Sequence, residues 1–421
     1  MKIVITGGGW AGCSAAYAAR KQGADVVLLE RTDLLLGTGL VGGIMRNNGR
    51  YTATEEMIAM GGGDIFQIID DNSRHTNINF PGHEHANLYD IAKTPVAITN
   101  YLKEIGVDVR LQERVVKAEV EDGVIKSIKT ASGEVFEADA FIDATGTAGP
   151  MNNCGMYGNG CAMCILRCPS YGGRVSLAGI CGIKEIRGTK ADGSIGAMSG
   201  SCKLYKESLA PEIIETLNRD GVAVIPLPEE LIENHLSVKA CQQYALKEFA
   251  ENVVLLDTGH AKLMTPYYTI EKLHKIPGFE NARYEDPYSG GKGNSMRYFD
   301  MSPRTNALQV IGLKNLFCAG EKAGLLVGHT EAIVTGVLAG YNTTRYLKDL
   351  PLLELSRKTA IGEAIAFVNE EMQTEEGLGK KYTFSGSVLF EHMKKLGLYE
   401  TDVDKIRETM KNEGLFNVFA S

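Results

Sequence analysis

The sequence predicts an α/β protein. A Rossmann-like domain, with a parallel sheet and a β-meander, is interrupted by an α+β cap or substrate domain and followed by a small helical tail. Three patterns carry this prediction. The chain opens with a strand, a glycine turn and a helix in "KIVITGGGWAGCSAAYAARKQGADVVLLER". A meander pattern then leads into an apolar strand that ends in "DATG", and a second strand, glycine loop and helix follow in "LKNLFCAGEKAGLLVGHTEAIVTGVLAGYN". The Rossmann-like domain is expected to comprise residues 1–150 and 275–347. The cap or substrate domain is expected at 151–274, and the helical tail at 348–421.

The first thirty residues carry a nucleotide-binding pattern. Gly7, Gly9 and Gly12 form G-x-G-x-x-G between the apolar run Ile3–Ile5 and a helix. The first glycine allows a tight turn, the second admits a pyrophosphate, and the third packs the helix on the strand. Glu30 ends the next strand, where a carboxylate binds ribose hydroxyls. The pattern therefore predicts a dinucleotide site at the N-terminus of the helix.

The layout of the remaining elements favours FAD over NAD as the dinucleotide. The segment 94–146 predicts a helix, a strand, a meander with the hairpin signals "EDGV" and "SGEV", and a last buried strand. The strand and small-residue helix beyond residue 312 complete the pattern. This layout resembles the glutathione-reductase-type FAD fold, in which the distant strand and helix return to the first unit. The resemblance implies FAD, with the N-terminus of the last helix at the flavin.

Four motifs make the resemblance more specific. "GGGWAGCSAA", "PGFENA", "YFDMSPRTNAL" and "LFCAGEKAGLLVGHTEAIVTGVLAGYN" are similar to the GidA/TrmFO family of FAD-dependent tRNA uridine-modifying enzymes. Carried onto this chain, the resemblance and the position of the loop after the second strand assign the FAD contacts. They are Gly7, Gly9, Trp10, Ala11, Gly12, Glu30, Arg31, Arg46, Asn47, Val115, Ala144, Thr145, Gly146, Gly320, Glu321, Gly328 and His329. For the asparagines of that loop, capping and turn roles remain open.

Three residues are the candidate catalytic groups. The resemblance places His329 and Glu321 at the flavin, and we predict that His329 is the proton donor to a reduced substrate. A hydrogen bond from His329 to flavin or backbone is the alternative. Arg167 lies between two clustered cysteines, where it would offset the negative charge of a cluster or of a substrate. A plain surface cation is the alternative for Arg167.

Four cysteines lie close together. The segment "CGMYGNGCAMCILRCP" holds Cys154, Cys161, Cys164 and Cys168 with the spacing C-x6-C-x2-C-x3-C-P, and its end is similar to a bacterial ferredoxin run. We therefore predict a 4Fe–4S cluster on these four thiolates. Zinc usually takes two separated C-x2-C pairs. A redox dithiol at Cys161 and Cys164, or four unligated thiols, also remains open.

The sequence leaves three functions open. The first is an iron–sulfur flavoenzyme that exchanges electrons between FAD and a small molecule or a redox protein such as ferredoxin. The second is an RNA uridine-modifying enzyme in which Cys168, in "CPS", is the carbon-carrying thiol. The third is a flavoprotein electron carrier. Acidic residues exceed basic ones by 52 to 44, no cysteine occurs between 14 and 153, and few residues follow Arg345 for an RNA-binding region, so nucleic acid is not the expected partner.

The remaining patterns indicate where the protein works. No apolar run reaches the roughly eighteen residues of a membrane span, and "MKIVIT" begins directly as a strand. The expected location is therefore the cytosol, where nine cysteines are not a disulfide framework. His83 and His85 are expected to be solvated loop histidines rather than metal ligands. The helical tail is the candidate surface for a homodimer.

Overall fold

A five-stranded parallel sheet forms the centre of the molecule. The computed structural model describes residues 1–147, 167–190, 192–195, 197–199, 202–233, 236, 242–264, 269–285 and 295–420. The sheet has the order β19-β10-β1-β2-β6, and all its pairs are parallel. Its strands are β1 (Lys2–Thr6), β2 (Asp25–Glu30), β6 (Asp108–Leu111), β10 (Ala140–Asp143) and β19 (Leu316–Cys318). A strand near residue 317 thus completes a sheet that begins at residue 2, which confirms the predicted parallel sheet.

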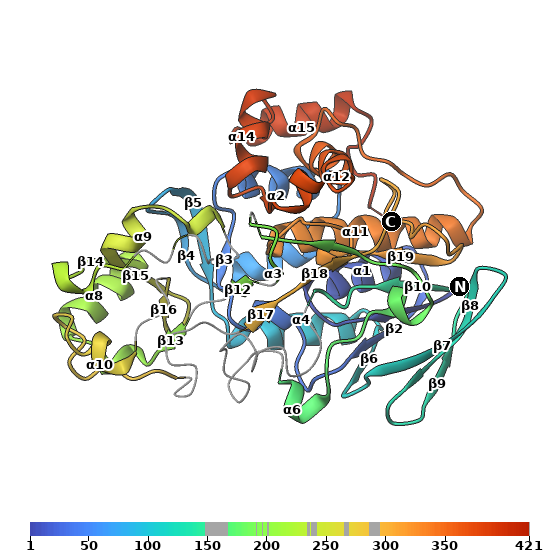
Figure 1. Cartoon of the computed structure of the whole chain (residues 1–421). Helices are drawn as coiled ribbons and strands as arrows, with labels where there is room; N and C mark the ends of the chain where they lie inside the picture. The colour runs from blue at the N-terminus through green and yellow to red at the C-terminus, as the bar shows by residue number, and fades with distance from the viewer. Residues whose placement is uncertain are drawn as a thin grey trace.

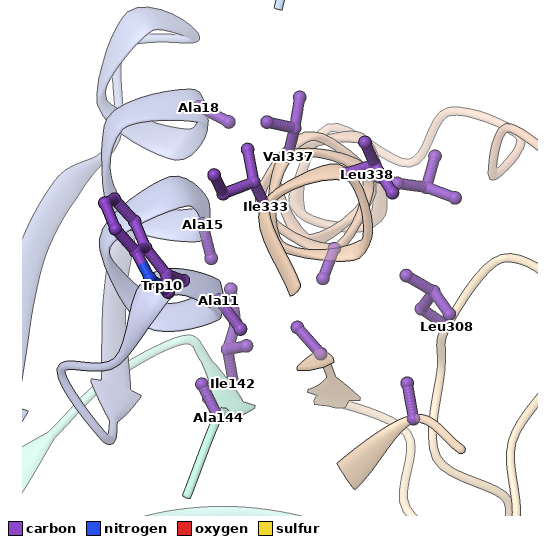
Figure 2. Close-up of a cluster of buried hydrophobic side chains, with 14 of the residues drawn as sticks. Trp10, Ala11, Ala15, Ala18, Ile142, Ala144, Leu308, Ile333, Val337 and Leu338 are labelled. Carbon is purple, nitrogen blue, oxygen red and sulfur yellow. The ribbon is translucent and has the colours of Figure 1, made fainter. Parts of the chain in front are cut away.

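Two helices from opposite parts of the sequence lie side by side on this sheet (Figure 1). They are α1 (Trp10–Lys21) and α11 (His329–Leu347). A Cβ on Gly336 would lie 2.4 Å from the carbonyl oxygen of Ala11, and one on Gly340 would lie 2.3 Å from that of Ala15. Figure 2 shows the alanines of α1 facing Ile333 and Val337 of α11. Small residues on both helices therefore bring the two backbones together, and this contact fixes the N-terminus of α11 beside the glycine turn.

The predicted β-meander is present beside the parallel sheet. It consists of β7 (Val115–Glu121), β8 (Val124–Thr130) and β9 (Val135–Glu137), paired antiparallel in that order. Helices α3 (Asp64–Asp71) and α4 (Lys93–Glu104) pack against each other, and α4 also packs against α1. Short helices α6 (Cys168–Tyr171) and α7 (Leu177–Ile180) follow the meander in sequence.

A separate antiparallel sheet lies within the segment that interrupts the Rossmann-like part. Its order is β13-β16-β15-β14, and its own apolar core includes Leu217, Leu255 and Phe279. The elements here are β13 (Cys202–Leu204), η2 (Lys206–Ser208), α8 (Pro211–Asp220), β14 (Val222–Pro226), η3 (Glu229–Leu231), η5 (Gln242–Tyr244), α9 (Glu248–Glu251), β15 (Asn252–Asp257), β16 (Ala261–Leu263) and α10 (Ile270–Leu273). In the described residues between 242 and 251, the only helical turns are the short η5 and α9, and the apolar run "VVLL" that follows lies in β15. We propose the divisions at 150, 275 and 347 as the domain boundaries.

Three smaller sheets connect these parts. One has the order β3-β5-β4 and consists of β3 (Ile44–Met45), β4 (Ser73–Phe80) and β5 (His83–Tyr89). The other two pair β11 (Ile186–Gly188) with β18 (Phe299–Met301), and β12 (Ala197–Ser199) with β17 (Ser295–Arg297). The turns η1 (Gly37–Leu40) and η6 (Gly320–Lys322) lie in the loops after β2 and β19.

The C-terminal residues form a helical layer over α2 (Gly49–Ala59), drawn in red in Figure 1. The layer holds α12 (Ala360–Glu371), α13 (Glu375–Leu378), β20 (Tyr382–Thr383), α14 (Ser387–Lys395) and α15 (Val403–Asn412). Asp402 caps α15, because its side chain accepts hydrogen bonds from the backbone N–H groups of Asp404 and Lys405. In the described part of the chain, no helix is long and apolar enough to cross a membrane.

A buried carboxyl group attaches this layer to α2. Glu56 accepts from the backbone N–H of Ala360 at 2.7 Å and of Ile361 at 3.0 Å, at the first turn of α12. Burial raises the pKa of Glu56 from 4.5 to about 7. Between these two values the folded protein binds more protons than the unfolded chain, so the free energy of unfolding falls as pH rises through this window.

Glu56→Gln removes this titration and is expected to flatten the dependence of stability on pH. Relative to Glu56→Gln, the wild type should lose about 3 kcal/mol of stability between pH ~4.5 and ~7.5. Urea unfolding at both pH values measures the change in the free energy of unfolding with pH for each protein. A destabilisation by the amide that is the same at both pH values cancels in this comparison. Glu104→Gln, at an exposed position on α4, is the control. Equal slopes for wild type and Glu56→Gln would contradict the assignment.

Candidate functional site

The glycine turn at the start of α1 forms an open cradle. Gly7 has φ +102°, and a Cβ on it would lie 2.4 Å from the carbonyl oxygen of Ala144. A Cβ on Gly12 would lie 1.8 Å from the carbonyl oxygen of Gly7. Among the described residues, no atom lies within 4 Å of a Cβ placed on Gly9, the N-cap residue of α1. The three glycines therefore provide the turn, the close packing and the open space that a pyrophosphate at a helix N-terminus requires.

Glu30 is fixed beside this turn. Its Oε2 accepts from the backbone N–H of Gly8, and its Oε1 accepts from that of Thr32, both at 2.8 Å. Glu30 is buried, with 8% of its surface exposed, at the end of β2. All the other side chains of this strand from Val26 onward are buried as well. Each carboxylate oxygen keeps a second lone pair. Glu30 can therefore accept hydrogen bonds from two further donors, such as ribose hydroxyls, without moving.

The end of β10 completes the cradle on its other side. Asp143 is fully buried, and its Oδ1 accepts from the backbone N–H of Thr145 at 3.1 Å and from its hydroxyl at 2.6 Å. Its Oδ2 accepts from the backbone N–H of Ala178 at 2.9 Å. Gly146 follows with φ +69°. Asp143 thus holds the Ala144–Gly146 turn against Gly7, a role that sequence reasoning did not assign to it. The predicted contact Val115 is a fully buried residue at the start of β7.

Aromatic and polar side chains surround His329 at the start of α11. Its Nε2 lies 3.5 Å from the hydroxyl of Thr38, and its Nδ1 lies 3.5 Å from the hydroxyl of Tyr89. The ring of Trp10 is 5.9 Å away between centroids. The Tyr89 hydroxyl donates to the carbonyl of Gly39 at 2.8 Å, and burial raises the pKa of Tyr89 far above its ordinary value. Sequence reasoning missed Tyr89, because the alternation in "HANLY" places it on the polar face of a strand, with His85 and Asn87, whereas the structure buries residues 86–89 on both faces.

The turn after β19 carries two charged side chains with defined partners. Glu321 accepts a hydrogen bond from the hydroxyl of Thr147. Lys322 is fully buried; its Nζ donates to the Ser176 hydroxyl at 2.9 Å and also contacts the carboxylate of Glu185. The turn at Gly320 is therefore connected to both the end of β10 and the segment around α7.

The loop between β2 and α2 is ordered by its own hydrogen bonds. Arg46 forms ion pairs with Asp70 at 2.6 Å and with Glu55 at 2.5 Å. The side-chain amide of Asn47 donates to Nδ1 of His83 at 2.9 Å. These contacts satisfy both residues within the protein, and their predicted contacts with FAD remain predictions.

The expected solvent exposure of His83 is wrong. The residue is 2% exposed in β5, its ring stacks on Phe80 with 4.7 Å between centroids, and its Nε2 donates to the carbonyl of Gln243 at 3.1 Å. Burial lowers the pKa of His83 to about 3, so its imidazole is neutral. Phe80 is close to His83 in the sequence, but Gln243 lies 160 residues away. His85 is half-buried and has no part in this cluster.

Helix α6 is attached to the loop that follows β2. Nη1 of Arg31 donates to the carbonyl of Gly172 at 2.6 Å, and Nη1 of Arg167 forms an ion pair with Asp33 at 2.5 Å. The Arg167 guanidinium also lies over the ring of Tyr171, 5.0 Å from its centroid. Cys168 therefore lies near the loop that follows Glu30 and β2. His329 and Glu321 belong to a different part of the site, which follows β19. The catalytic role expected for Arg167 remains a prediction.

Most of the cysteines of the predicted metal cluster lie outside the residues that the structure describes. Cys154, Cys161 and Cys164 lie outside the described residues, and Cys168 is half-buried with a free thiol. Among the residues that the structure describes, no three His, Cys, Asp or Glu side chains are grouped to hold a metal ion.

Comparison with known proteins identifies the family. A model of the glucose inhibited division protein A family matches residues 2–253 and 260–351. The chain belongs to this family. This confirms the resemblance found in the sequence motifs, and the GidA match extends through the interrupting segment as well as the Rossmann-like part.

Curated relatives of this GidA-family chain include two enzymes named tRNA uridine 5-carboxymethylaminomethyl modification enzyme MnmG. The one from Chlorobium phaeovibrioides is 26% identical over 430 residues, which cover 89% of this chain and 67% of that protein. The one from Desulfotalea psychrophila is 24% identical over 423 residues, covering 85% and 62%. The chain thus spans about two thirds of the length of these relatives.

The solved structures support the fold of the GidA-family chain. A structure of Aquifex aeolicus GidA aligns with a TM-score of 0.62 and 16% identity, covering 98% of this chain and 76% of that one. A second crystal form of the same protein aligns with a TM-score of 0.59. The likeness extends over nearly the whole chain and therefore includes the interrupting segment and the C-terminal helices.

Proposed function

We propose that this chain binds FAD in the cradle between β1, β2 and β10. The space at Gly9, which is open among the described residues and lies in front of the N-terminus of α1, is the observation that carries the proposal, because a pyrophosphate bound at a helix N-terminus requires such a space. Glu30 is fixed next to that space for the ribose hydroxyls. In this proposal the flavin end lies near the N-terminus of α11, because His329 at that end lies 5.9 Å from Trp10, the first residue of α1, between ring centroids.

We propose that the protein is an FAD-dependent enzyme that modifies uridine in tRNA. The names of the curated relatives support this function over the expected exchange of electrons with a small molecule or ferredoxin. FAD supplies hydride transfer when bound. In this proposal, His329 donates a proton through its imidazole, and the neighbouring Thr38 and Tyr89 hydroxyls orient the ring. A cytosolic location and a homodimer accompany the proposal, both still predictions.

Binding to tRNA tests the proposed substrate. The flavin-loaded protein is titrated into a fluorescently labelled, unmodified tRNA transcript, and anisotropy is followed at several salt concentrations. A DNA hairpin of equal length is the control. Saturable binding to tRNA, weakening with salt and absent for the hairpin, is expected. Equally weak binding to both nucleic acids would contradict the tRNA proposal and favour the flavoenzyme that acts on a small molecule.

The cysteine spacing supports a second proposal that is independent of tRNA. A 4Fe–4S cluster on Cys154, Cys161, Cys164 and Cys168 would add one-electron chemistry to the two-electron chemistry of the flavin. Anaerobic purification with iron and acid-labile sulfide determination tests it. About four of each per chain would support the cluster. Iron-free protein would contradict the proposed cluster, and Cys168 would then be the candidate carbon-carrying thiol.

A further inference from the structure

A short segment of the loop after β2 lies between β16 and the start of α11. This segment is Val41–Gly43. On one side, Nζ of Lys262 in β16 donates to the carbonyl oxygen of Val41 at 2.6 Å. Lys262 is only 5% exposed, and a buried ammonium group needs acceptors of this kind to offset its lost hydration. The contact therefore holds the segment to a sheet far away in the sequence.

On the other side, the same segment touches the imidazole of His329. A Cβ on Gly42 would lie 1.8 Å from Cε1 of His329, 2.6 Å from its Nδ1, and 2.8 Å from the Tyr89 hydroxyl. Only hydrogen atoms on Gly42 fit against the ring at this distance. If the Gly42 backbone moved, the His329 imidazole could therefore take a different position.

A second contact fixes the segment to the same antiparallel sheet. Gly43 has φ +84°, and a Cβ on it would lie 2.2 Å from the Cγ2 methyl of Thr258, which follows β15. The Thr258 carbonyl accepts from the backbone N–H of Ile91 at 3.1 Å, and the Gly43 carbonyl accepts from that of Tyr89 at 3.0 Å. Residues on both faces thus leave the segment little freedom, and Lys262 makes the charged contact.

We propose that Lys262 is a positioning residue for His329. Its hydrogen bond to the Val41 carbonyl holds Val41–Gly43 against the imidazole, which keeps the ring between the hydroxyls of Thr38 and Tyr89. Lys262 acts through the backbone of this segment and transfers no proton itself. The inference rests on the proposed function only for the reaction that His329 serves; the contact does not depend on FAD or RNA.

The test follows the ring nitrogens of His329 directly. The flavin-loaded protein is labelled with ¹⁵N-histidine, and His329→Gln identifies the His329 signals among the eight histidines. Lys262→Met and Gly42→Ala are both expected to shift the Nδ1 and Nε2 resonances of His329. Lys203→Met is the matched control, because Lys203 is paired directly opposite Lys262 on β13 and forms an ion pair with Glu285 at 3.4 Å. Its spectrum should keep the wild-type His329 signals.

Turnover provides a second measurement. Lys262→Met is expected to lower kcat on tRNA about tenfold with little change in KM, and Lys262→Arg should restore most of it. Unchanged His329 resonances in Lys262→Met, alongside shifted ones in Gly42→Ala, would overturn the proposal. If Lys262→Met does not fold, Lys262→Gln is judged by the same criterion. Failure of tRNA binding leaves the resonance shifts intact, so it is distinguishable from failure of this inference.

Discussion

Gly9→Val is expected to abolish FAD binding while leaving the protein folded. The backbone of Gly9 has φ −71° and ψ −174°, an extended conformation that valine adopts readily. The space in front of it is open among the described residues, so the new side chain meets no protein atom within 4 Å at its Cβ. It does occupy the proposed pyrophosphate position. We expect FAD affinity to fall at least about 100-fold, which corresponds to roughly 3 kcal/mol.

Titration of the flavin-free protein with FAD, followed by flavin fluorescence, measures this loss. Thermal unfolding without FAD shows whether the fold is retained. Gly12→Ala is the contrasting variant, because its Cβ would lie 1.8 Å from the Gly7 carbonyl oxygen and must displace α1 from β1. It should lower the melting temperature of the flavin-free protein, whereas Gly9→Val should not. Normal FAD binding by Gly9→Val would place the nucleotide elsewhere.

Glu331→Leu is expected to destabilise the protein by about 3–5 kcal/mol. The Glu331 side chain is fully buried in α11 and contacts Nε of Arg50 at 3.2 Å. It also accepts from the Thr383 hydroxyl at 2.7 Å and from the backbone N–H of Phe384 at 2.9 Å. The pair therefore joins α2, α11 and β20. Removal of the carboxylate takes the Glu331 counter-charge from the buried guanidinium of Arg50 and removes the acceptor of the Phe384 N–H, which costs far more than the loss of one surface contact.

Urea unfolding of the single and double variants measures this coupling. The double variant Arg50→Met/Glu331→Leu is expected to lose less stability than the sum of the two single variants, because neither charge remains unpaired. Lys247→Met is the control. Lys247 pairs with Glu251 at 3.2 Å, but its side chain is 80% exposed, and such pairs contribute about 0–1 kcal/mol. A Glu331→Leu cost as small as this control would contradict the account.

The parallel sheet and the glycine turn were predictable because local patterns determine them. The run Ile3–Ile5 is apolar throughout, as a strand covered on both faces requires, and each glycine of the motif has a distinct steric reason. The return of β19 to the edge of the sheet beside β10, and of α11 to α1, followed from the family resemblance. The small residues of α11, Gly336 and Gly340, are the local features that make this contact close.

The surroundings of the site were less predictable because distant residues form them. The burial of His83 depends on the distant Gln243 as well as on the nearby Phe80, and that of Lys322 depends on the distant Ser176 and Glu185. No periodic pattern in a short window reports such contacts. Lys262 is another example, since a lysine in a short strand is usually solvated and only the folded chain shows its contact with Val41.

The flavin content of the purified protein tests the central claim most directly. The protein is purified without added nucleotide, denatured, and its released cofactor is identified by chromatography and visible absorbance. We predict FAD at up to one molecule per chain, with incorporation completed by added FAD in the wild type and lost in Gly9→Val. Protein that stays free of FAD after incubation with it, or that takes up only a nicotinamide dinucleotide, would contradict the account.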